Sequence, residues 1–370
     1  MKYYIKTFGC QMNYSDSERI ATVLEKQGFR PASDIKKANL AIFNTCGVRQ
    51  MAEDRVYGQI HNLRKSQLPS SKSQTNRTIV LTGCLANRPD VRRRLKDKVE
   101  LFCEIKEFPQ KIKALLASSS KGTTDPYLSI KPSYSSKFSA FVPVMTGCNN
   151  FCSYCVVPYA RGREISRPAT EILKEVRSLV KNGYKFITLV GQNVNSYQDN
   201  KISFPSLLKK ANAIPGKFWL SFMTSHPKDM SDDLIKVVAQ SPKVCEFVHL
   251  PIQAGDDKIL KAMNRKYTRA HYLKLIAKIK KAFQKYKPGQ LYGLAGDIIV
   301  GFPGETKKQF LESAKVLEKV RYDMLYFGQF SPRYGTAAAK MKDNVSKKEK
   351  ERRENYLNAI LKDTAINNNR

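Results

Sequence analysis

Short apolar runs alternate with amphipathic stretches over most of the 370 residues. Near the start of the chain, residues 1–8, 40–44 and 79–82 have the pattern of strands, and helical stretches lie between them. Strand, helix and strand in that order predict a small parallel α/β domain over residues 1–116. Residues 66–77 are polar and rich in serine, which predicts a surface loop.

A second strand-and-helix pattern begins after a break in composition. Residues 117–137 contain Ser, Gly and Pro with little periodicity, so we interpret them as a linker between domains. The candidate strands that follow are residues 140–145, 186–190, 218–223, 246–250, 296–300 and 325–330. The clearest amphipathic stretch between them, residues 268–283, carries Tyr272, Ile276, Ile279 and Phe283 on one helical face.

Six strand–helix units over residues 138–339 predict a parallel sheet covered by helices. Because a closed TIM barrel needs eight units, we expect an open or partial (β/α)6 barrel. In such folds the site lies at the carboxyl ends of the strands. Residues 340–370 have a charged, mostly helical pattern and no apolar core of their own.

The net charge of the chain indicates the class of partner that it binds. Lys and Arg number 65 against 32 Asp and Glu, a net charge of +33. Such an excess favours a polyanionic partner, nucleic acid before an anionic membrane, although Lys-rich codon usage is an alternative explanation. No apolar run reaches the roughly 18 residues that a membrane span needs, and the N-terminus lacks an apolar signal segment. We therefore expect a cytoplasmic protein.

Three of the eight cysteines lie within eight residues, directly after the first strand of the second domain. Cys148, Cys152 and Cys155 have the spacing CxxxCxxC, which in a reducing compartment indicates metal or redox chemistry. Three such thiolates suit three irons of a [4Fe–4S] cube, whose fourth iron is left open to a ligand. The alternatives are a zinc site, which would need a fourth Cys or His, and structural cysteines.

Three further cysteines each follow a candidate strand of the first domain. Cys10, Cys46 and Cys84 are flanked by Gly or Asn, which allow unusual backbone angles at a strand end. Because parallel strands end at the same edge of a sheet, these thiolates would hold a second cluster, again one ligand short. Three buried apolar cysteines are the alternative. Cys103 and Cys245 fit neither set, and we interpret them as structural.

The motifs resemble a known enzyme family along nearly the whole chain. CxxxCxxC at the mouth of a partial barrel resembles the radical S-adenosylmethionine superfamily. GCQMN at residues 9–13, NTC at 44–46 and TGC at 82–84 resemble the N-terminal domain of its methylthiotransferases. The resemblance implies two [4Fe–4S] clusters, S-adenosylmethionine as cofactor, and an electron donor such as flavodoxin or ferredoxin. It also implies a monomer.

Within that family, the sequence after Cys10 and the stretch ARGRE at 160–164 resemble the branch that modifies tRNA carrying isopentenyladenosine at position 37. The resemblance implies that one S-adenosylmethionine methylates a sulfur on the auxiliary cluster and that a second supplies a radical that activates carbon 2 of the adenine. A radical route suits an aromatic C–H bond that has no useful acidity. The other branches act on threonylcarbamoyladenosine or a ribosomal protein, and a zinc-stabilised RNA-binding protein without catalysis is a further alternative.

Several polar residues near these motifs have two interpretations each. Gly191 and Gln192 end the second barrel strand and are either contacts to the amino end of S-adenosylmethionine or an ordinary turn. Tyr154 lies near the cofactor's adenine or packs under the cluster. Arg161 and Arg163 bind phosphate or the cofactor's carboxylate, or form salt bridges.

The chain departs from the family's pattern at its C-terminal end. The family ends in a small RNA-binding β-barrel, the TRAM domain, and no β-rich segment follows residue 339 here. We therefore expect that module to be absent, with tRNA attraction left to the Lys and Arg residues of the catalytic domains.

Overall fold

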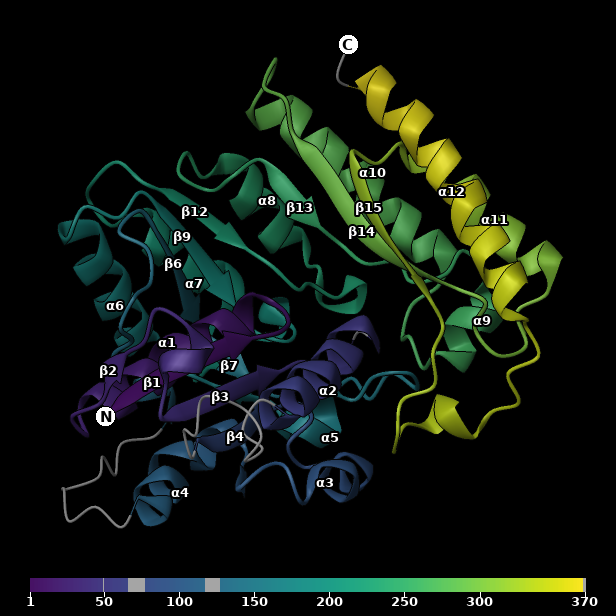
Figure 1. The fold of residues 1–370 in the computed structure, drawn as a ribbon. Helices are drawn as coiled ribbons and strands as arrows, with labels where there is room; N and C mark the ends of the chain where they lie inside the picture. Colours follow the sequence, from purple (N-terminus) through teal and green to yellow (C-terminus); the bar gives the residue numbers. More distant parts are fainter. Residues whose placement is uncertain (49, 66–76, 117–126, 369–370) are drawn as a thin grey trace. The chain divides into compact units, whose positions relative to one another are not determined.

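The structure is a computed structural model that describes residues 1–48, 50–65, 77–116 and 127–368. The chain divides into two compact units. Unit 1 comprises residues 1–143 and 156–163, and unit 2 comprises residues 144–155 and 164–370. Each unit is described by itself below, and Figure 1 shows the elements of both.

Unit 1 contains a five-stranded parallel sheet in the order β2-β1-β3-β4-β5. Its strands are β1 (Lys2–Thr7), β2 (Arg30–Pro31), β3 (Leu40–Thr45), β4 (Thr78–Gly83) and β5 (Leu101–Phe102). In the register, Thr45 of β3 lies opposite Gly83 of β4. The three long strands β1, β3 and β4 are adjacent, so their carboxyl ends share one edge of the sheet.

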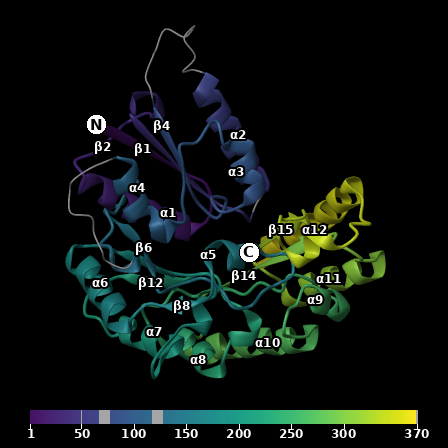
Figure 2. The ribbon, with the colours of Figure 1, turned by 90° about the horizontal axis from the view of Figure 1, so that it is seen from below.

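Helices cover both faces of this sheet, as Figure 2 shows. The helices are α1 (Gln11–Glu25), α2 (Gln50–Lys65), α3 (Pro89–Leu95) and α4 (Phe108–Leu115). Alternate residues of β3 supply the two cores. Ile42 packs with residues of α1 and α4, whereas Phe43 packs with residues of α2 and α3. The predicted parallel α/β arrangement of the first domain is confirmed.

The segment that we interpreted as a linker contributes to the core of unit 1. Tyr127 and Ile130 are buried with α1 and α4, because their apolar side chains cover the end of that core. Residues 117–126 of the proposed linker, like residues 66–76 of the proposed loop, lie outside the described residues. Unit 1 also includes β6 (Ser139–Pro143) and α5 (Val157–Arg161).

Unit 2 has parallel strands close to where the sequence predicts them. β9 (Phe186–Val190) pairs with β12 (Trp219–Phe222), and β14 (Gly293–Val300) lies between β13 (Phe247–His249) and β15 (Met324–Gln329). Two short antiparallel pairs complete the strands: β7 (Met145–Thr146) with β8 (Ile165–Ser166), and β10 (Gln198–Asp199) with β11 (Ile202–Ser203). The α/β class with parallel sheets is therefore confirmed.

The helices of unit 2 follow the strands in chain order. They are α6 (Ala169–Lys181), α7 (Phe204–Asn212), α8 (Asp232–Gln240), α9 (Asp257–Ala262), α10 (Arg269–Tyr286), α11 (Lys307–Val320) and α12 (Lys347–Asn368). Helix α6 packs on α7, α7 on α8 and α8 on α10, which Figure 2 shows as an arc outside the strands. The amphipathic face predicted for residues 268–283 is buried in α10, which begins after the N-cap Thr268.

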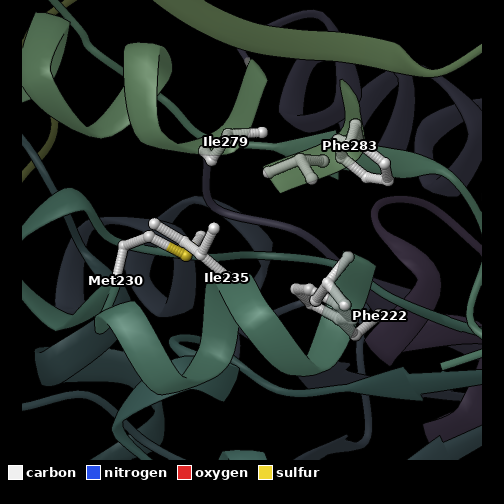
Figure 3. Close-up of a pocket in the computed structure, with 7 residues that line it drawn as sticks. Phe222, Met230, Ile235, Ile279 and Phe283 are labelled. Carbon is white, nitrogen blue, oxygen red and sulfur yellow. The ribbon is translucent and has the colours of Figure 1, made fainter. Parts of the chain in front are cut away.

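The interior of unit 2 is closely packed between α8 and α10. Figure 3 shows Phe222, Met230, Ile235, Ile279 and Phe283 around an apolar space of about 10 Å³. A space of this size holds one water at most and offers no polar partner for it, so it is a packing void rather than a ligand site. None of the helices in the described ranges is both long and apolar enough to span a membrane.

Candidate functional site

The cysteines predicted for the first cluster lie on one loop of unit 2. This loop leaves β7, and β8, which follows helix α5, pairs antiparallel with β7. Phe151 has a positive φ of 47°, which turns the backbone sharply inside the loop. Cys148 and Cys152 are buried, and Cys155 is partly exposed. Burial raises the pKa of the Cys148 thiol.

The end of helix α9 holds this cysteine loop in place. Ser153 donates its backbone N–H to Met263 O at 3.0 Å and its hydroxyl to Ala262 O at 2.8 Å. The side-chain amide of Asn264, a residue with a φ of 55°, donates to Phe151 O at 2.9 Å. Three hydrogen bonds from a distant segment therefore fix the backbone around the central cysteine.

Arg265 follows this turn and contacts a cysteine of the loop. Its Nη1 lies 3.4 Å from the Sγ of Cys152, and its Nε donates to the Tyr267 hydroxyl at 2.8 Å. Burial disfavours the Arg265 charge, but Tyr154, Tyr267 and Cys152 more than offset that effect and raise its pKa. Tyr154 faces the same group, and burial of its phenol raises its pKa well above the usual range.

Acceptors without partners gather at the carboxyl ends of the neighbouring strands. In the described part of the chain, the Oε1 of Gln192 after β9 and the Oγ of Ser225 after β12 are buried without a hydrogen bond. The Oδ1 of Asn193 is buried in the same way, while its amide donates to Asp229 at 2.8 Å. A cofactor with an ammonium group and hydroxyls would satisfy such atoms.

Gly191 is required by packing rather than by backbone angle. A Cβ at this position would lie 2.6 Å from the Cγ of Met145 in β7, so only glycine allows β9 to approach the start of the cysteine loop. Its carbonyl accepts the Thr224 hydroxyl at 2.8 Å. Gly191 therefore allows the end of β9 to approach Met145 just before the cysteine loop, and the cofactor contact at Gly191 and Gln192 stays a prediction.

Two histidines are buried in unit 2. His226 accepts the backbone N–H of Lys228 on its Nδ1 at 3.1 Å, and burial lowers its pKa to about 2. His249 places its Nε2 3.0 Å from the Asp297 carboxylate. Among the described residues, the Nδ1 of His249 has no partner.

The second cysteine set lies at the carboxyl edge of the unit 1 sheet. Cys10 follows β1 as the N-cap of α1, Cys46 follows β3 and Cys84 follows β4. A Cβ at Gly9 would lie 2.6 Å from the Cβ of Cys46, and one at Gly47 would lie 3.4 Å from that of Cys84. These short approaches show that the fold brings the three cysteines together.

Two asparagines brace the edge between these cysteines. Asn13 accepts the Cys10 thiol at 3.3 Å and donates to the Asn44 side chain at 3.0 Å. Asn44 donates back to Asn13 O at 2.7 Å. Gly83, with a φ of 84°, has room for no Cβ, because the carbonyl oxygen of Thr45 would lie 2.4 Å away. The backbone of all three cysteine loops is therefore fixed before any ligand binds.

Arg161 lies in the electrostatic surroundings of this second set. Its Nη2 donates to Asp16 at 2.7 Å, and both side chains are almost fully buried. Although burial opposes its charge, Asp16 and the thiols of Cys84 and Cys10 raise its pKa well above the usual range. The Nη1 of Arg161 is buried without a partner in the described part of unit 1. Arg163, in contrast, is exposed.

Both cysteine sets have the donors that an iron–sulfur cluster requires. Each offers three thiols, and each has a buried arginine beside it whose charge suits an anionic group. In a four-iron cube each thiolate binds a different iron, whereas a zinc ion draws its ligands to one point. Over the described ranges, no three His, Cys, Asp or Glu side chains meet at one such point.

The remaining cysteines lie apart from both sets. Cys103 is fully buried in the core of unit 1, where burial raises its pKa to about 12. Cys245 is partly buried in unit 2. Arg265 and Asn264 are the functional candidates that the sequence analysis missed. Arg265 lies 113 residues after Cys152 and Asn264 lies 113 residues after Phe151, so no local spacing connects them with the cysteine loop.

Two family models match the chain, one in each part. The Radical SAM superfamily model matches residues 142–317, and the model described as Uncharacterized protein family UPF0004 matches residues 2–103. Each model covers one of the cysteine sets.

Solved structures with the same fold include a radical S-adenosylmethionine methyltransferase, TsrM, of Kitasatospora setae. It aligns with a TM-score of 0.63 at 14% identity, over 91% of this chain and 75% of that chain. The cobalamin-dependent S-adenosylmethionine radical enzyme OxsB aligns with a TM-score of 0.61 at 11% identity, over 98% of this chain and 56% of that chain. At these identities the likeness concerns the fold alone.

Curated relatives are much more similar in sequence. A tRNA-2-methylthio-N(6)-dimethylallyladenosine synthase of Syntrophomonas wolfei is 43% identical, over 97% of this chain and 81% of the relative. Proteins of the same name from Thermoanaerobacter pseudethanolicus and Clostridioides difficile are 43% and 42% identical, over 93% and 92% of this chain and 74% and 73% of theirs. The chain therefore belongs to the tRNA-2-methylthio-N(6)-dimethylallyladenosine synthase family.

Proposed function

We propose that this protein methylthiolates carbon 2 of N6-isopentenyladenosine 37 in tRNA. The observation that carries the proposal is the pair of three-cysteine sets in a chain 43% identical to synthases named for this reaction. One set follows the parallel strands of unit 1, and the other lies on the loop after β7 of unit 2. The overall change replaces the C2–H bond of the base by a C2–S bond to a methylthio group.

Cys148, Cys152 and Cys155 would hold one [4Fe–4S] cluster, and S-adenosylmethionine would bind beside it. When bound, these groups supply the one-electron chemistry needed to attack a C–H bond without useful acidity. The unpartnered Gln192 amide oxygen would accept from the cofactor's ammonium group. Tyr154, which lies within the cysteine loop, is proposed as a further cofactor contact.

Cys10, Cys46 and Cys84 would hold the auxiliary cluster, which supplies the sulfur when bound. The asparagine contacts at Cys10 and the close approaches of Gly9 to Cys46 and of Gly47 to Cys84 support this assignment, because they bring the three cysteine loops close together. Arg161 and Asp16 would balance charge beside that cluster. Arg163, which is exposed, is proposed as a further contact to the cofactor or to an RNA phosphate.

We also propose that the strands of the radical domain form a partial (β/α)6 barrel. The parallel pairings, the outer arc of helices and the bridge between Leu220 and Val244 support this form. The proposed domains are residues 1–116, the radical core 138–339 and the helical extension 340–370. Residues 117–137 connect the first two, and Tyr127 and Ile130 of this connection pack in the core of unit 1. We propose that the protein works as a cytoplasmic monomer on the tRNA anticodon stem-loop, with flavodoxin or ferredoxin as electron donor.

The experiment that tests this proposal uses anaerobically reconstituted protein. Incubation with reductant, S-adenosylmethionine and isopentenylated tRNA should yield 2-methylthio-N6-isopentenyladenosine by nucleoside mass spectrometry. If threonylcarbamoyladenosine tRNA or a ribosomal protein is converted instead, the protein acts on the substrate of another branch of the methylthiotransferases. A colourless protein that carries zinc instead of about eight irons would overturn the radical reaction itself.

A further inference from the structure

Arg265 is a buried cation without a carboxylate partner. Its residue is only 8% exposed, and its hydrogen bonds go to Tyr267, to the carbonyl of Pro251 at 3.1 Å and to the Cys152 sulfur at 3.4 Å. No Asp or Glu in the described part of the chain pairs with it. A buried charge is costly unless an opposite charge compensates it.

Three other buried arginine side chains have carboxylate partners. Arg161 pairs with Asp16, Arg167 with Glu171 and Glu175, and Arg353 with Glu305 and Glu349. Arg265 differs because its one sulfur contact is a cysteine of the proposed cluster. Three thiolates around an iron–sulfur cube carry net negative charge, so the loaded site would supply the missing partner.

The surrounding structure aims the guanidinium at that sulfur. Arg265 Nε and Nη2 are held by Tyr267 and Pro251, which leaves Nη1 directed to Cys152. Tyr267 is fixed in turn, because its hydroxyl donates to Ile252 O at 2.6 Å. The backbone just before Arg265 is hydrogen-bonded to the cysteine loop through Asn264 and Met263. Arginine and cysteine therefore form one rigid element.

We propose that Arg265 is a positioning residue that donates an N–H···S hydrogen bond to the Cys152 ligand and sets the reduction potential of the radical cluster. An N–H donor on a ligand sulfur, together with a positive charge, stabilises the reduced and more negative state of the cluster. Arg265 thereby raises the potential and makes the electron easier to accept. This inference rests on the proposed cluster at Cys148, Cys152 and Cys155.

The test is a potentiometric titration of the full chain without tRNA. The electron paramagnetic resonance signal of the reduced cluster is measured at each potential. Every sample carries C10A, C46A and C84A, so that one cluster is measured. We expect R265Q to titrate at a more negative potential than its parent. R265K keeps the positive charge but lacks the planar guanidinium and its fixed N–H directions. Its reduction potential should therefore shift less, in the same direction.

The matched control is R353Q, which removes another buried arginine of unit 2 whose partners are carboxylates. It should titrate at the parent's potential. If R265Q does not hold iron, R265K carries the test. If the variant at position 265 that binds the cluster has the same reduction potential as its parent, the inference is wrong. A parent without any cluster overturns the proposed function instead, so the two failures are distinguishable.

Discussion

Each cysteine set contains three thiols, but the two units bring these thiols together in different ways. In unit 2 one loop of eight residues supplies all three thiols, and a distant helix end holds that loop from outside. In unit 1 three loops supply one thiol each, and the parallel sheet brings them together. The first site therefore depends on local backbone shape, whereas the second depends on the register of an entire sheet.

The arginines beside the two sets also differ, in the partners that balance their charge. Arg265 in unit 2 contacts a cysteine directly and has no carboxylate partner in the described structure. Arg161 in unit 1 is neutralised by Asp16 and keeps one nitrogen free of described partners. In unit 2 the positive charge of Arg265 is left for a bound cluster to balance. In unit 1 Asp16 already balances the charge of Arg161. The following predictions test this contrast.

The largest effect is expected from removing one thiol of either set. C152A and C84A should each abolish the methylthiolated product and lower iron from about eight to about four per chain. They should differ in a second product, because C84A keeps the radical site and still cleaves S-adenosylmethionine, whereas C152A does not. Iron analysis and assay of 5′-deoxyadenosine measure both outcomes. Equal loss of cleavage in the two variants would remove the distinction between the sites.

Asp16→Asn should destabilise unit 1 by about 3–5 kcal/mol, because it leaves the buried Arg161 charge without its counter-ion. It also weakens the hydrogen bond that Asp16 accepts from Tyr127. Urea unfolding of the cluster-free full chain measures the loss. Asp54→Asn, at an exposed carboxylate bonded to Gln50, is the control and should change stability by less than about 0.5 kcal/mol.

Gly83→Ala should cost about 2–5 kcal/mol, from the strain of a left-handed residue and from overpacking against the Thr45 carbonyl. Because Gly83 precedes Cys84, the variant should also bind less iron at the auxiliary site while the radical site stays loaded. Gly28→Ala has a similar φ of 81° but meets nothing within 4 Å, so it isolates the backbone strain. If the two variants lose equal stability, the close approach of β3 and β4 is not what holds the cysteine edge.

A smaller effect concerns pH and His226 in unit 2. Its folded pKa of about 2 lies below the ordinary value near 6.5, so the unfolded chain binds the proton first as pH falls. The contribution of His226 is complete above pH 6.5 and is lost as pH falls from there toward 2. Between pH 7 and pH 5 this amounts to about 2 kcal/mol. Urea unfolding at both values should show a smaller pH dependence for His226→Asn, and an identical dependence would contradict the prediction.

The strands and the two cysteine sets could be read from the sequence because their signals are local. An apolar run such as residues 186–190 becomes β9 with the same bounds, since five consecutive residues that favour strands need no distant information. The spacing of Cys148, Cys152 and Cys155 is likewise contained in eight residues. The positions of Cys10, Cys46 and Cys84 after strands were also visible, although their proximity had to be assumed from a parallel sheet.

The contacts of the arginines were not readable in this way. Arg161 lies six residues after Cys155, yet it contacts Asp16, 145 residues away in the chain. Arg265 reaches Cys152 over 113 residues. Pairings at such separations are selected by the packing of whole elements, so no spacing in the sequence indicates them.

The sequence by itself determined the long parallel strands, their order and the α/β class, and it singled out the six cysteines, because propensity, periodicity and ligand spacing act over a few residues. The tertiary structure alone decided which charges face those cysteines. It directs Arg161 to the unit 1 set, and it places Arg265 on the Cys152 sulfur without a carboxylate. The physical reason is that a buried charge is tolerated only where the fold supplies a partner, and only the folded chain shows where that partner is.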